Sequence, residues 1–382
     1  MRRVLVFSGN RAEFGLLQLI VSRMRGDPRL SPVVAISGAL ADPMWGGFRE
    51  QLQDGNQVDH ILEVGARGLD GAGVCAVIGD LVARVGALIA RDRPDVLLVL
   101  GDRFETLAAT LAAHYHNVVI AHIHGGDRVL TDCRDNNVRH AISKLANLHF
   151  VACADSRDRL ERMGESADRI HLVGSPAAEI VRASPLLDPA ETRSRLGLGD
   201  GEPFCLVTMH PENVDAATNL RYQQSLLEGL EAAAMTAVIT YPNNDPGGDA
   251  MIAALEAART PYRTILRASL GMRLYLSALR DCVFVAGNSS SGIIETGLFH
   301  KPTIDCGGRQ RGRVCGPNVI RCETFGREEV ARAVRHALTP EFRNLAAAAP
   351  SPYDIGDTSR MICDTMAAVP LGDDLRLKPI TY

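Results

Sequence analysis

The chain has 382 residues, a length that favours two domains over one. With 46% hydrophobic and 23% charged residues, it has the composition of a globular protein and is too apolar for a disordered one. The formal net charge of −4 provides no bulk positive field, so we expect neither a nucleic-acid nor a membrane partner.

Short apolar runs alternate with turns and segments of helical period along the whole chain. The runs in the first half cover residues 3–7, 33–37, 95–100, 118–121 and 149–152, and helical segments cover 16–25 and 72–91. The runs in the second half cover residues 204–209, 237–241, 282–286 and 302–305. Continuous apolar runs are typical of strands covered on both faces, so the pattern predicts parallel α/β sheets in two Rossmann-like halves.

The stretch 184–203 is rich in Pro, Gly, Asp and Arg and marks the predicted boundary between the halves. Two such halves suggest a cleft between them. Ligands of open α/β sheets bind outside the carboxyl ends of the strands, so the residues that follow each strand are the candidates for chemistry.

The first such loop, residues 8–15, contains glycine and Arg11 and leads into a helix. It suits an anion, although an ordinary turn with a surface arginine has the same pattern. The dinucleotide fingerprint G-x-G-x-x-G does not occur in this loop, which argues against a nicotinamide cofactor.

Asp102 and Arg103 follow the run 95–100 directly, so a carboxylate and a cation lie at a strand end. Asp102 serves either in a site or as a cap of the next helix. Farther along, strand alternation places His122 and His124 on one face. No third ligand follows at metal spacing, so we predict no metal.

Asp135 and Arg139 are four residues apart and share a face of the next predicted helix. An exposed ion pair would have the same spacing. In the second half, His210 follows a strand beside a proline turn, where it is either catalytic or structural.

The run 282–286 leads into the segment 287–295, in which small hydroxyl residues precede a predicted helix. Ser289 and Ser290 suit a phosphate cradle, and Glu295 suits the ribose hydroxyls. The alternative is a serine-rich helix cap with an exposed glutamate. Only three of the 41 basic residues are lysines, so an anion site must use arginines. The loop 307–313 supplies Arg309, Arg311 and Arg313. The alternative is that this loop is merely solvated.

Taken in order, these segments resemble the UDP-N-acetylglucosamine 2-epimerase family, most of all its hydrolysing, sialic-acid-pathway branch. The resemblance covers most of the chain and is carried by residues 9–13, 101–103, 122–126, 139–146, 241–245, 287–290 and 309–313. Each segment alone is a weak signal, whereas the ordered set is specific.

The resemblance implies a glycosyltransferase-B architecture, with two Rossmann-like domains facing across a cleft. Residues 1–183 would form the domain with the catalytic carboxylates, joined by the C-terminal segment 357–382, and residues 184–356 would form the UDP-binding domain. It also implies a homodimer or higher homo-oligomer, UDP-N-acetylglucosamine as substrate, and no metal or other cofactor.

The resemblance implies site residues as well. The catalytic group would be Asp102, His124, Asp135, Arg139 and His210. The UDP site would comprise Arg11, Arg103, Asn243, Ser289, Ser290, Glu295, Arg309 and Arg313, with His210 also near the nucleotide. One position departs from the family pattern: His124 stands where better-known members carry glutamate in H-x-E-G-G, so His124, Asp127 or Asp102 would take over its acid/base work.

The implied chemistry explains why carboxylates and arginines are needed. Loss of UDP from C1 makes the C2 proton acidic, so a base near C2 and cations at the diphosphate act together. The 2-acetamidoglucal intermediate then takes up water, giving N-acetylmannosamine, or UDP, giving UDP-N-acetylmannosamine. A glycosyltransferase of the same architecture and a non-catalytic sugar-nucleotide binder remain as alternatives.

Cysteine usage and apolar runs indicate the compartment. Nine cysteines occur singly, without a C-x-x-C pair, which is typical of core residues in a reducing environment. The most apolar runs are shorter than the roughly 20 residues of a membrane helix, and the run 3–7 is typical of a buried strand, not of a signal peptide. We predict a cytoplasmic protein.

Overall fold

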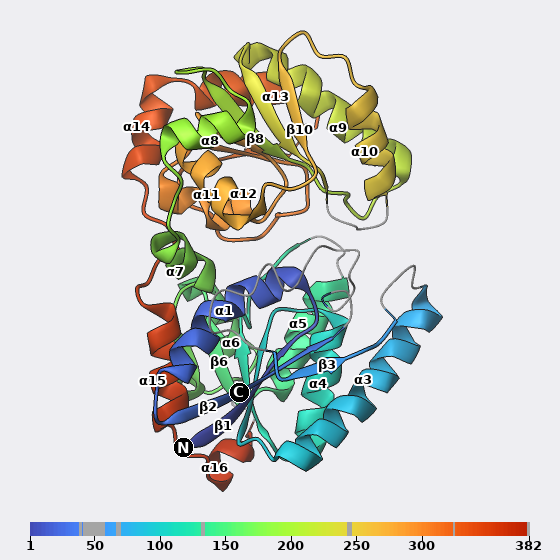
Figure 1. Cartoon of the computed structure of the whole chain (residues 1–382), viewed down its shortest axis with the longest axis vertical. Coiled ribbons are helices and arrows are strands. Elements are labelled where there is room, and N and C mark those ends of the chain that lie inside the picture. Colours follow the sequence, from blue (N-terminus) through green and yellow to red (C-terminus); the bar gives the residue numbers. More distant parts are fainter. Residues whose placement is uncertain are drawn as a thin grey trace. The chain divides into compact units, whose positions relative to one another are not determined.

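The computed structural model describes residues 1–37, 40, 58–65, 70–130, 134–242, 247–323 and 325–379 (Figure 1). The chain divides into two compact units. Unit 1 comprises Met1–Arg128, Arg134–Ile180 and Ile355–Tyr382, and unit 2 comprises Val129–Cys133 and Val181–Asp354.

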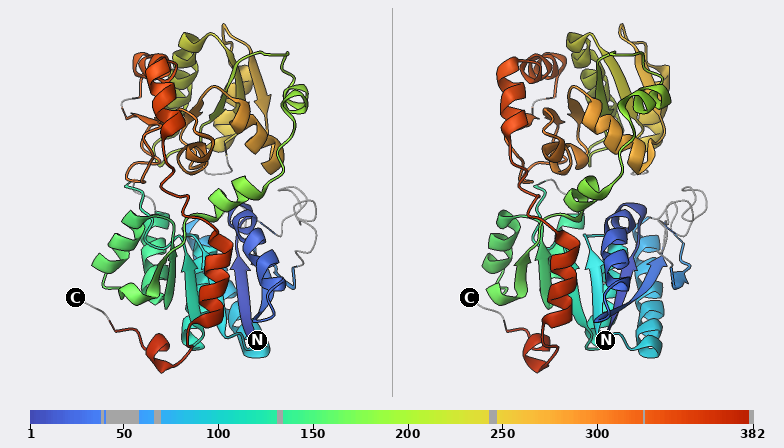
Figure 2. Two further views of the ribbon diagram at one scale, coloured as in Figure 1. Left: turned by 90° about the vertical axis from the view of Figure 1, so that its left-hand side faces the viewer. Right: turned by 60° about the vertical axis from the view of Figure 1, so that its left-hand side comes forward.

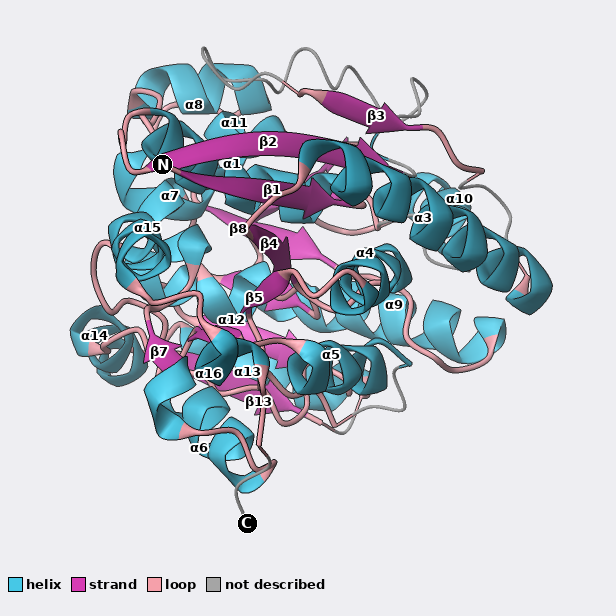
Figure 3. Cartoon of the chain, turned by 90° about the horizontal axis from the view of Figure 1, so that it is seen from below, coloured by secondary structure: helices cyan, strands magenta, loops and turns pink. Residues whose placement is uncertain are grey.

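Unit 1 contains a seven-stranded parallel sheet of order β3-β2-β1-β4-β5-β6-β7 (Figure 3). The strands are β1 (Arg2–Ser8), β2 (Leu30–Ser37), β3 (His60–Leu62), β4 (Val96–Leu100), β5 (Val119–Ile123), β6 (Leu148–Val151) and β7 (Ile170–Leu172). β1 pairs with both β2 and β4, so the strand order reverses between β1 and β4. Ligands of open α/β sheets bind outside the carboxyl ends of the strands at such a switch point.

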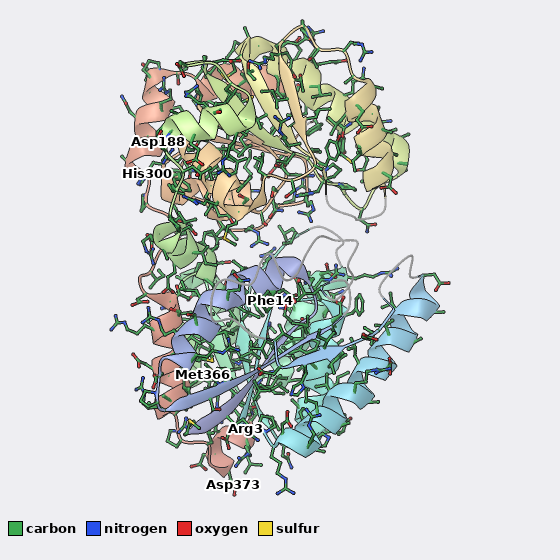
Figure 4. All side chains as sticks on the ribbon, viewed as in Figure 1. Arg3, Phe14, Asp188, His300, Met366 and Asp373 are labelled. Atoms are coloured by element: carbon green, nitrogen blue, oxygen red, sulfur yellow. The ribbon has the colours of Figure 1, made fainter. Side chains whose placement is uncertain are left out.

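Helices cover both faces of this sheet. They are α1 (Arg11–Arg25), α3 (Gly71–Asp92), α4 (Phe104–Tyr115), α5 (Arg134–Leu145), α6 (Ala154–Arg162), α15 (Thr358–Ala368) and α16 (Asp373–Arg376), while α7 (Pro176–Ala183) spans the unit boundary. The C-terminal helix α15 packs beside α1, drawn in red and dark blue in Figure 2. Phe14 of α1 and Met366 of α15, labelled in Figure 4, are buried in the same core. The opposite face of the sheet packs against α3 and α4.

Unit 2 repeats the design with a six-stranded parallel sheet of order β10-β9-β8-β11-β12-β13. The strands are β8 (Phe204–Thr208), β9 (Thr236–Thr240), β10 (Thr264–Arg267), β11 (Val285–Gly287), β12 (Thr303–Cys306) and β13 (Val319–Cys322). The helices are α8 (Pro189–Leu196), α9 (Ala216–Leu230), α10 (Gly248–Ala257), α11 (Gly271–Asp281), α12 (Ser291–Ile294), α13 (Arg327–Ala337) and α14 (Pro340–Ala348). A core of apolar side chains lies on each face of the sheet.

All nine predicted strands are present, with ends that differ by a few residues, and the parallel α/β class is confirmed. Four further strands were not predicted: β3, β7, β10 and β13, which are the edge strands of the two sheets. Most of their residues are only partly buried, so they lack the continuous apolar run that interior strands require. The prediction was also wrong about α1, which begins at Arg11 and not at residue 16.

The longest described helix, α3, bears on the membrane prediction. Within the described part of the chain, α3 is long and apolar enough to cross a membrane by length and composition, and it was not among the short apolar runs that the sequence analysis considered. One side of α3 nevertheless packs into the core of unit 1 beside α4, with buried apolar side chains from Val77, Leu81, Val85, Leu88 and Ile89. That pattern is typical of a helix that covers a sheet.

The segment after α15 is fastened to unit 1 by buried polar groups. Arg169 donates to the carbonyls of Asp374, Leu375 and Leu377. Lys378 Nζ donates to the carbonyl of Lys144, at the end of α5, at 2.7 Å, and lies 2.7 Å from Glu165 Oε2. The C-terminal segment therefore caps the carboxyl end of α5.

Candidate active site

Asp102 and Arg139 form an ion pair at the carboxyl ends of the central strands of unit 1. Asp102 lies in the turn after β4, with its side chain 22% exposed, and Arg139 on α5 is buried. The guanidinium of Arg139 donates to Asp102 Oδ2 and, at 3.1 Å, to the carbonyl of His124. A buried guanidinium in these contacts orients the Asp102 carboxylate and leaves it partly open to solvent.

His124 occupies an unusual place just beyond the end of β5. Its backbone is left-handed, with φ of +63°, so strand alternation does not reach it, and the prediction that His122 and His124 share a strand face was wrong. His124 Nδ1 lies 2.9 Å from Asp127 Oδ2, and Nε2 lies 3.2 Å from Ser175 Oγ. A carboxylate only accepts, so His124 Nδ1 donates to Asp127. The result is a buried Asp127–His124–Ser175 chain.

His122 braces the loop that carries Asp102. It is completely buried, its Nε2 lies 2.7 Å from the carbonyl of Gly101, and its Nδ1 lies 3.2 Å from Ser143 Oγ. Burial lowers the pKa of His122 to about 3, so the ring is neutral and donates from Nε2 to the carbonyl. Both ring nitrogens of His122 therefore have hydrogen-bond partners, and no group of three or more metal-ligating side chains occurs among the described residues.

Arg103 lies among carboxylates at the start of α4. Its Nε is 3.5 Å from Glu105 Oε2, and its guanidinium lies 5.5 Å from the ring of Phe104. Burial opposes the charge of Arg103, but Glu105, Asp135 and Glu13 outweigh it and raise the pKa of the guanidinium. Asp135, in the first turn of α5, therefore faces the same cation that follows Asp102 in the chain.

Glu13 and Glu105 were not among the predicted site residues. Both are buried, Glu13 in α1 and Glu105 in α4. A signal for them is present in the sequence, because Gly9–Glu13 and Gly101–Glu105 both fit the pattern G-[ND]-R-x-E. The two segments follow the adjacent strands β1 and β4, so the repeated pattern identifies a pair of matching turns.

In unit 2, the turn after β8 is fixed to the turn after β11. Asn288 Oδ1 accepts from the backbone N–H of His210 at 2.7 Å, and Asn288 Nδ2 donates to the carbonyl of His210 at 2.9 Å. The carboxylate of Glu212 accepts from the backbone N–H of Gly308 at 3.1 Å. His210 is thus held beside the loop that carries Arg309.

Buried side chains hold the arginine loop. Gln310 donates to the carbonyl of Asn288 at 3.0 Å and accepts from Arg313 Nε at 2.9 Å. Arg321 donates to the carbonyl of Arg313 at 2.7 Å and pairs with Asp305 at 2.5 Å. Burial raises the pKa of Asp305 to about 6, although Arg321 opposes the shift. Gln310 and Arg321 therefore hold this loop in place, while the Arg311 side chain is 53% exposed.

The serine segment differs from the prediction in one respect. The helix α12 has only four residues, begins at Ser291 after Ser290, and gives way to a 3-10 turn. Such a short helix adds little dipole, so an anion there would depend on individual N–H and hydroxyl groups. Glu295 is mostly buried and accepts from Ser291 Oγ, which also lies 2.5 Å from the Tyr275 hydroxyl. Burial raises the pKa of the Glu295 carboxyl.

The predicted residues thus form two sets. Unit 1 brings together Asp102, Arg103, His124, Asp135 and Arg139, and unit 2 places His210, Ser289, Ser290, Glu295, Arg309 and Arg313 on the turns that follow β8, β11 and β12. Arg11 begins α1, but its side chain lies outside the described part, as does the whole of Asn243. Contacts in the structure add Ser175, Glu212 and Arg321 to these sets, none of which the sequence analysis named.

Known proteins agree with this architecture. Residues 22–367 match the family model described as UDP-N-acetylglucosamine 2-epimerase. A UDP-N-acetylglucosamine 2-epimerase of Neisseria meningitidis serogroup B is 29% identical over 340 residues, which are 89% of this chain and 88% of the relative. The hydrolysing UDP-N,N'-diacetylbacillosamine 2-epimerase of Legionella pneumophila is 28% identical over 386 residues, covering 100% of both proteins.

Solved structures give the same result for the fold. The crystal structure of UDP-GlcNAc 2-epimerase from Neisseria meningitidis bound to UDP-GlcNAc has a TM-score of 0.82 at 18% identity, covering 96% of this chain and 99% of that one. The Methanocaldococcus jannaschii UDP-GlcNAc 2-epimerase in complex with UDP-GlcNAc and UDP has a TM-score of 0.76 at 15% identity, covering 96% and 100%. The predicted architecture of two Rossmann-like domains is confirmed, and this chain belongs to the UDP-N-acetylglucosamine 2-epimerase family.

Proposed function

We propose that this protein is a hydrolysing 2-epimerase that converts a UDP-linked 2-acetamido sugar into UDP and the free C2-inverted sugar. The family match over residues 22–367 and the end-to-end match to the hydrolysing Legionella enzyme support this reaction. UDP-N-acetylglucosamine is the first substrate to test, because the Neisseria relative is named for it. The observation that carries the proposal is the Asp102–Arg139 pair at the ends of the central strands of unit 1.

The reaction has two steps. In the first, the bond from C1 to the UDP oxygen breaks, a base takes the proton from C2, and a C1–C2 double bond forms. In the second, water adds its hydroxyl to C1, and a proton returns to C2 from the opposite face. Each step needs a group that exchanges a proton and a setting that stabilises the charge on the diphosphate.

Unit 1 carries the acid/base groups in this proposal. Asp102, oriented by Arg139, and Asp135 exchange the C2 proton. His124 has Nδ1 engaged by Asp127 and Nε2 by Ser175, and its carbonyl accepts from Arg139. These contacts support a role in which His124 orients the Asp102–Arg139 pair. His124 occupies the position at which better-known members carry a glutamate.

Unit 2 carries the nucleotide groups. Arg309 and Arg313 bind the diphosphate together with Ser289 and Ser290, and Glu295 binds the ribose. Glu212 and Gln310 connect the turns that follow β8, β11 and β12. These contacts support the assignment, because a preorganised anion site stabilises developing charge without rearrangement. Arg11, Arg103, His210 and Asn243 complete the proposed set. In domain terms, residues 1–183 with 357–382 supply the chemistry, and residues 184–356 hold UDP.

Turnover in D₂O tests the proposal. With UDP-N-acetylglucosamine we expect free N-acetylmannosamine that carries deuterium at C2, together with stoichiometric UDP, followed by ¹H and ³¹P NMR. Deuterated UDP-N-acetylmannosamine would replace the hydrolysing branch with the non-hydrolysing one. Tight binding without exchange would indicate a sugar-nucleotide binder, and exchange only after an acceptor is added would indicate a glycosyltransferase. UDP-N,N'-diacetylbacillosamine, run in parallel, tests the substrate for which the Legionella relative is named.

We also propose a cytoplasmic homodimer. Small residues recur at helical spacing on the exposed side of α3, next to the surface ion pair of Asp80 and Arg84, namely Ala72, Ala76, Gly79, Ala83 and Ala90. Such a face lets the backbone of a second copy approach closely, which supports an interface. Light scattering on a sizing column tests it: Ala83→Arg should give monomer, and Ala216→Arg, at an exposed position of α9, should not. A dimeric Ala83→Arg protein would exclude α3 as the interface.

A further inference from the structure

Two glutamates pack crosswise between adjacent turns of unit 1: the glutamate of each turn lies against the glycine of the other turn. A Cβ atom on Gly9, after β1, would lie 2.5 Å from the Cβ of Glu105, and a Cβ atom on Gly101, after β4, would lie 3.2 Å from Glu13 Oε1. Each turn therefore has a glycine where the glutamate of the other turn packs. A side chain at either glycine would displace a buried carboxyl group.

Hydrogen bonds reinforce this crossed arrangement. Glu13 Oε2 accepts from the backbone N–H of Gly9 at 3.4 Å, and Glu13 Oε1 accepts from Thr106 Oγ1 at 3.5 Å. Glu13 thus spans from its own turn to α4, whereas Glu105 lies beside Arg103 at 3.5 Å. The two glutamates connect the turns after β1 and β4, where the strand order reverses.

The charges in this cluster do not cancel if both glutamates are ionised. Two charged groups face Glu13: Arg103, which precedes α4, and Glu105, in the first turn of α4. Asp135 of α5 faces both Arg103 and Glu105. Burial, followed by the charge of Glu105, raises the pKa of Glu13 to about 8, against the opposing effect of Arg103. Burial raises the pKa of Glu105 as well, and the adjacent Arg103 guanidinium opposes that shift. Glu13 is therefore held mainly uncharged at neutral pH, while Glu105 lies next to the guanidinium.

We propose that Glu13 and Glu105 are positioning residues that lock the turns after β1 and β4 together and hold the Arg103 guanidinium ready for the diphosphate of the substrate. The inference rests on the proposed function, because it assigns Arg103 to the diphosphate. Neither glutamate contacts the reacting atoms in this proposal. They act on ligand affinity through Arg103, whose side chain is 38% exposed and available to an anion.

A double-mutant cycle tests the route through Arg103. Glu105→Gln keeps the shape of the side chain and removes its charge, so we expect Kd for UDP and KM to rise about tenfold while kcat changes less than about twofold. If Glu105 acts through Arg103, the double variant Arg103→Gln/Glu105→Gln loses no more affinity than Arg103→Gln alone. Losses that add in the double variant would overturn the proposal. Glu161→Gln, at an exposed position of α6, is the matched control.

The pH profile tests the role of Glu13. Above about pH 8, ionisation of Glu13 in the wild-type protein places a second negative charge beside Glu105 and loosens the pair, so Kd for UDP should rise. Glu13→Gln removes that group, and its Kd should stay flat through the same range. Parallel profiles for the two proteins would show that Glu13 does not position the cluster. A merely structural glutamate would change the melting temperature without changing the shape of this profile.

The wild-type protein separates the two hypotheses. If it neither binds UDP nor turns over the sugar nucleotide, the proposed function fails and this inference fails with it. If the wild type is active while Glu105→Gln binds UDP normally, only the inference fails. Circular dichroism and thermal unfolding of each variant confirm that the compared proteins are folded.

Discussion

Arg139 of α5 and Asp102 of the turn after β4 are 37 residues apart in the chain and form a direct ion pair in unit 1. The same guanidinium donates to the carbonyl of His124. One buried cation therefore ties together the ends of β4 and β5. This connection depends on a side chain from a third element, because Arg139 belongs to α5 and not to the turn after either strand.

Asp102→Asn should abolish proton exchange while leaving UDP bound. Asparagine keeps the size of the side chain but is not basic, so kcat should fall by about 10²- to 10⁴-fold, with Kd for UDP unchanged within about twofold. Deuterium incorporation at C2 and isothermal titration with UDP measure the two effects. The matched control is Asp155→Asn, which removes the partner of Arg159 on α6. Near-normal turnover of Asp102→Asn would remove Asp102 from the acid/base group.

His122 should matter for geometry and not for its charge. Because its pKa is about 3, the ring stays neutral above pH 5, and substitution should introduce no change in the pH profile between pH 5 and 9. His122→Phe removes the donor to Gly101 and should lower kcat by at least about tenfold, the cost of leaving a buried carbonyl without its hydrogen bond. His122→Gln restores an N–H donor and should recover part of the activity.

Steady-state kinetics against pH checks the role of His122, with the exposed His114→Gln as the control. A kinetic limb near pH 6.5 that disappears in His122→Gln would contradict a neutral brace. Equal activity of His122→Phe and the wild-type protein would show that the contact with Gly101 does not position Asp102.

Glu165 should be among the most important polar side chains for the stability of unit 1. Its carboxylate is fully buried and meets Lys144 at 2.7 Å, Lys378 at 2.7 Å and His149 at 3.1 Å. Burial disfavours its charge, but the hydrogen bonds from these three partners outweigh burial and lower the pKa of Glu165 to about 2. Glu165→Gln leaves Lys378, whose side chain is 14% exposed, and the partly exposed Lys144 without their anion, and should lower the free energy of unfolding by about 3 kcal/mol.

The pH dependence of stability follows from the direction of this shift. A carboxyl whose pKa is lower in the folded state stabilises the fold above its unfolded pKa, and the contribution disappears as the pH falls from about 4.5 towards 2. Urea unfolding from pH 3 to pH 7 should therefore show a steeper acid loss in the wild-type protein than in Glu165→Gln. Glu191→Gln, which breaks a surface pair with Arg195, should cost less than about 0.5 kcal/mol. Similar losses in the two variants would contradict the buried role.

Gly287→Ala tests the close approach of β11 to β8. The φ of Gly287 is +130°, and an added Cβ would lie 1.9 Å from the carbonyl oxygen of Thr208. Strain and collision together should lower the free energy of unfolding by at least about 3 kcal/mol. Gly271, with φ of +65° and no atom within 4 Å, provides the matched control, for which alanine should cost about 1–2 kcal/mol. Equal effects in chemical denaturation would show that the collision is relieved elsewhere.

The sequence predicted the interior of both sheets and missed their edges, for one physical reason. Interior strands such as β4 and β8 are buried on both faces and must be continuously apolar, which a single chain displays directly. Edge strands such as β7 and β10 are partly exposed, and their identity depends on the strand beside them. That neighbour is fixed by the fold and not by the local sequence.

Residues at strand ends and family motifs led to the prediction that Asp102, Asp135, Arg139 and the arginine loop belong to the site, because their positions follow from chain order alone. Their roles stay a prediction. Tertiary structure decided the partners: Asp127 and Ser175 on either side of His124, Glu212 against Gly308, and the crossed pair Glu13 and Glu105. A local pattern records which residues a turn contains. Contacts between turns that are distant in the chain exist only once parallel strands bring their carboxyl ends together, and those contacts determine how each site residue is held.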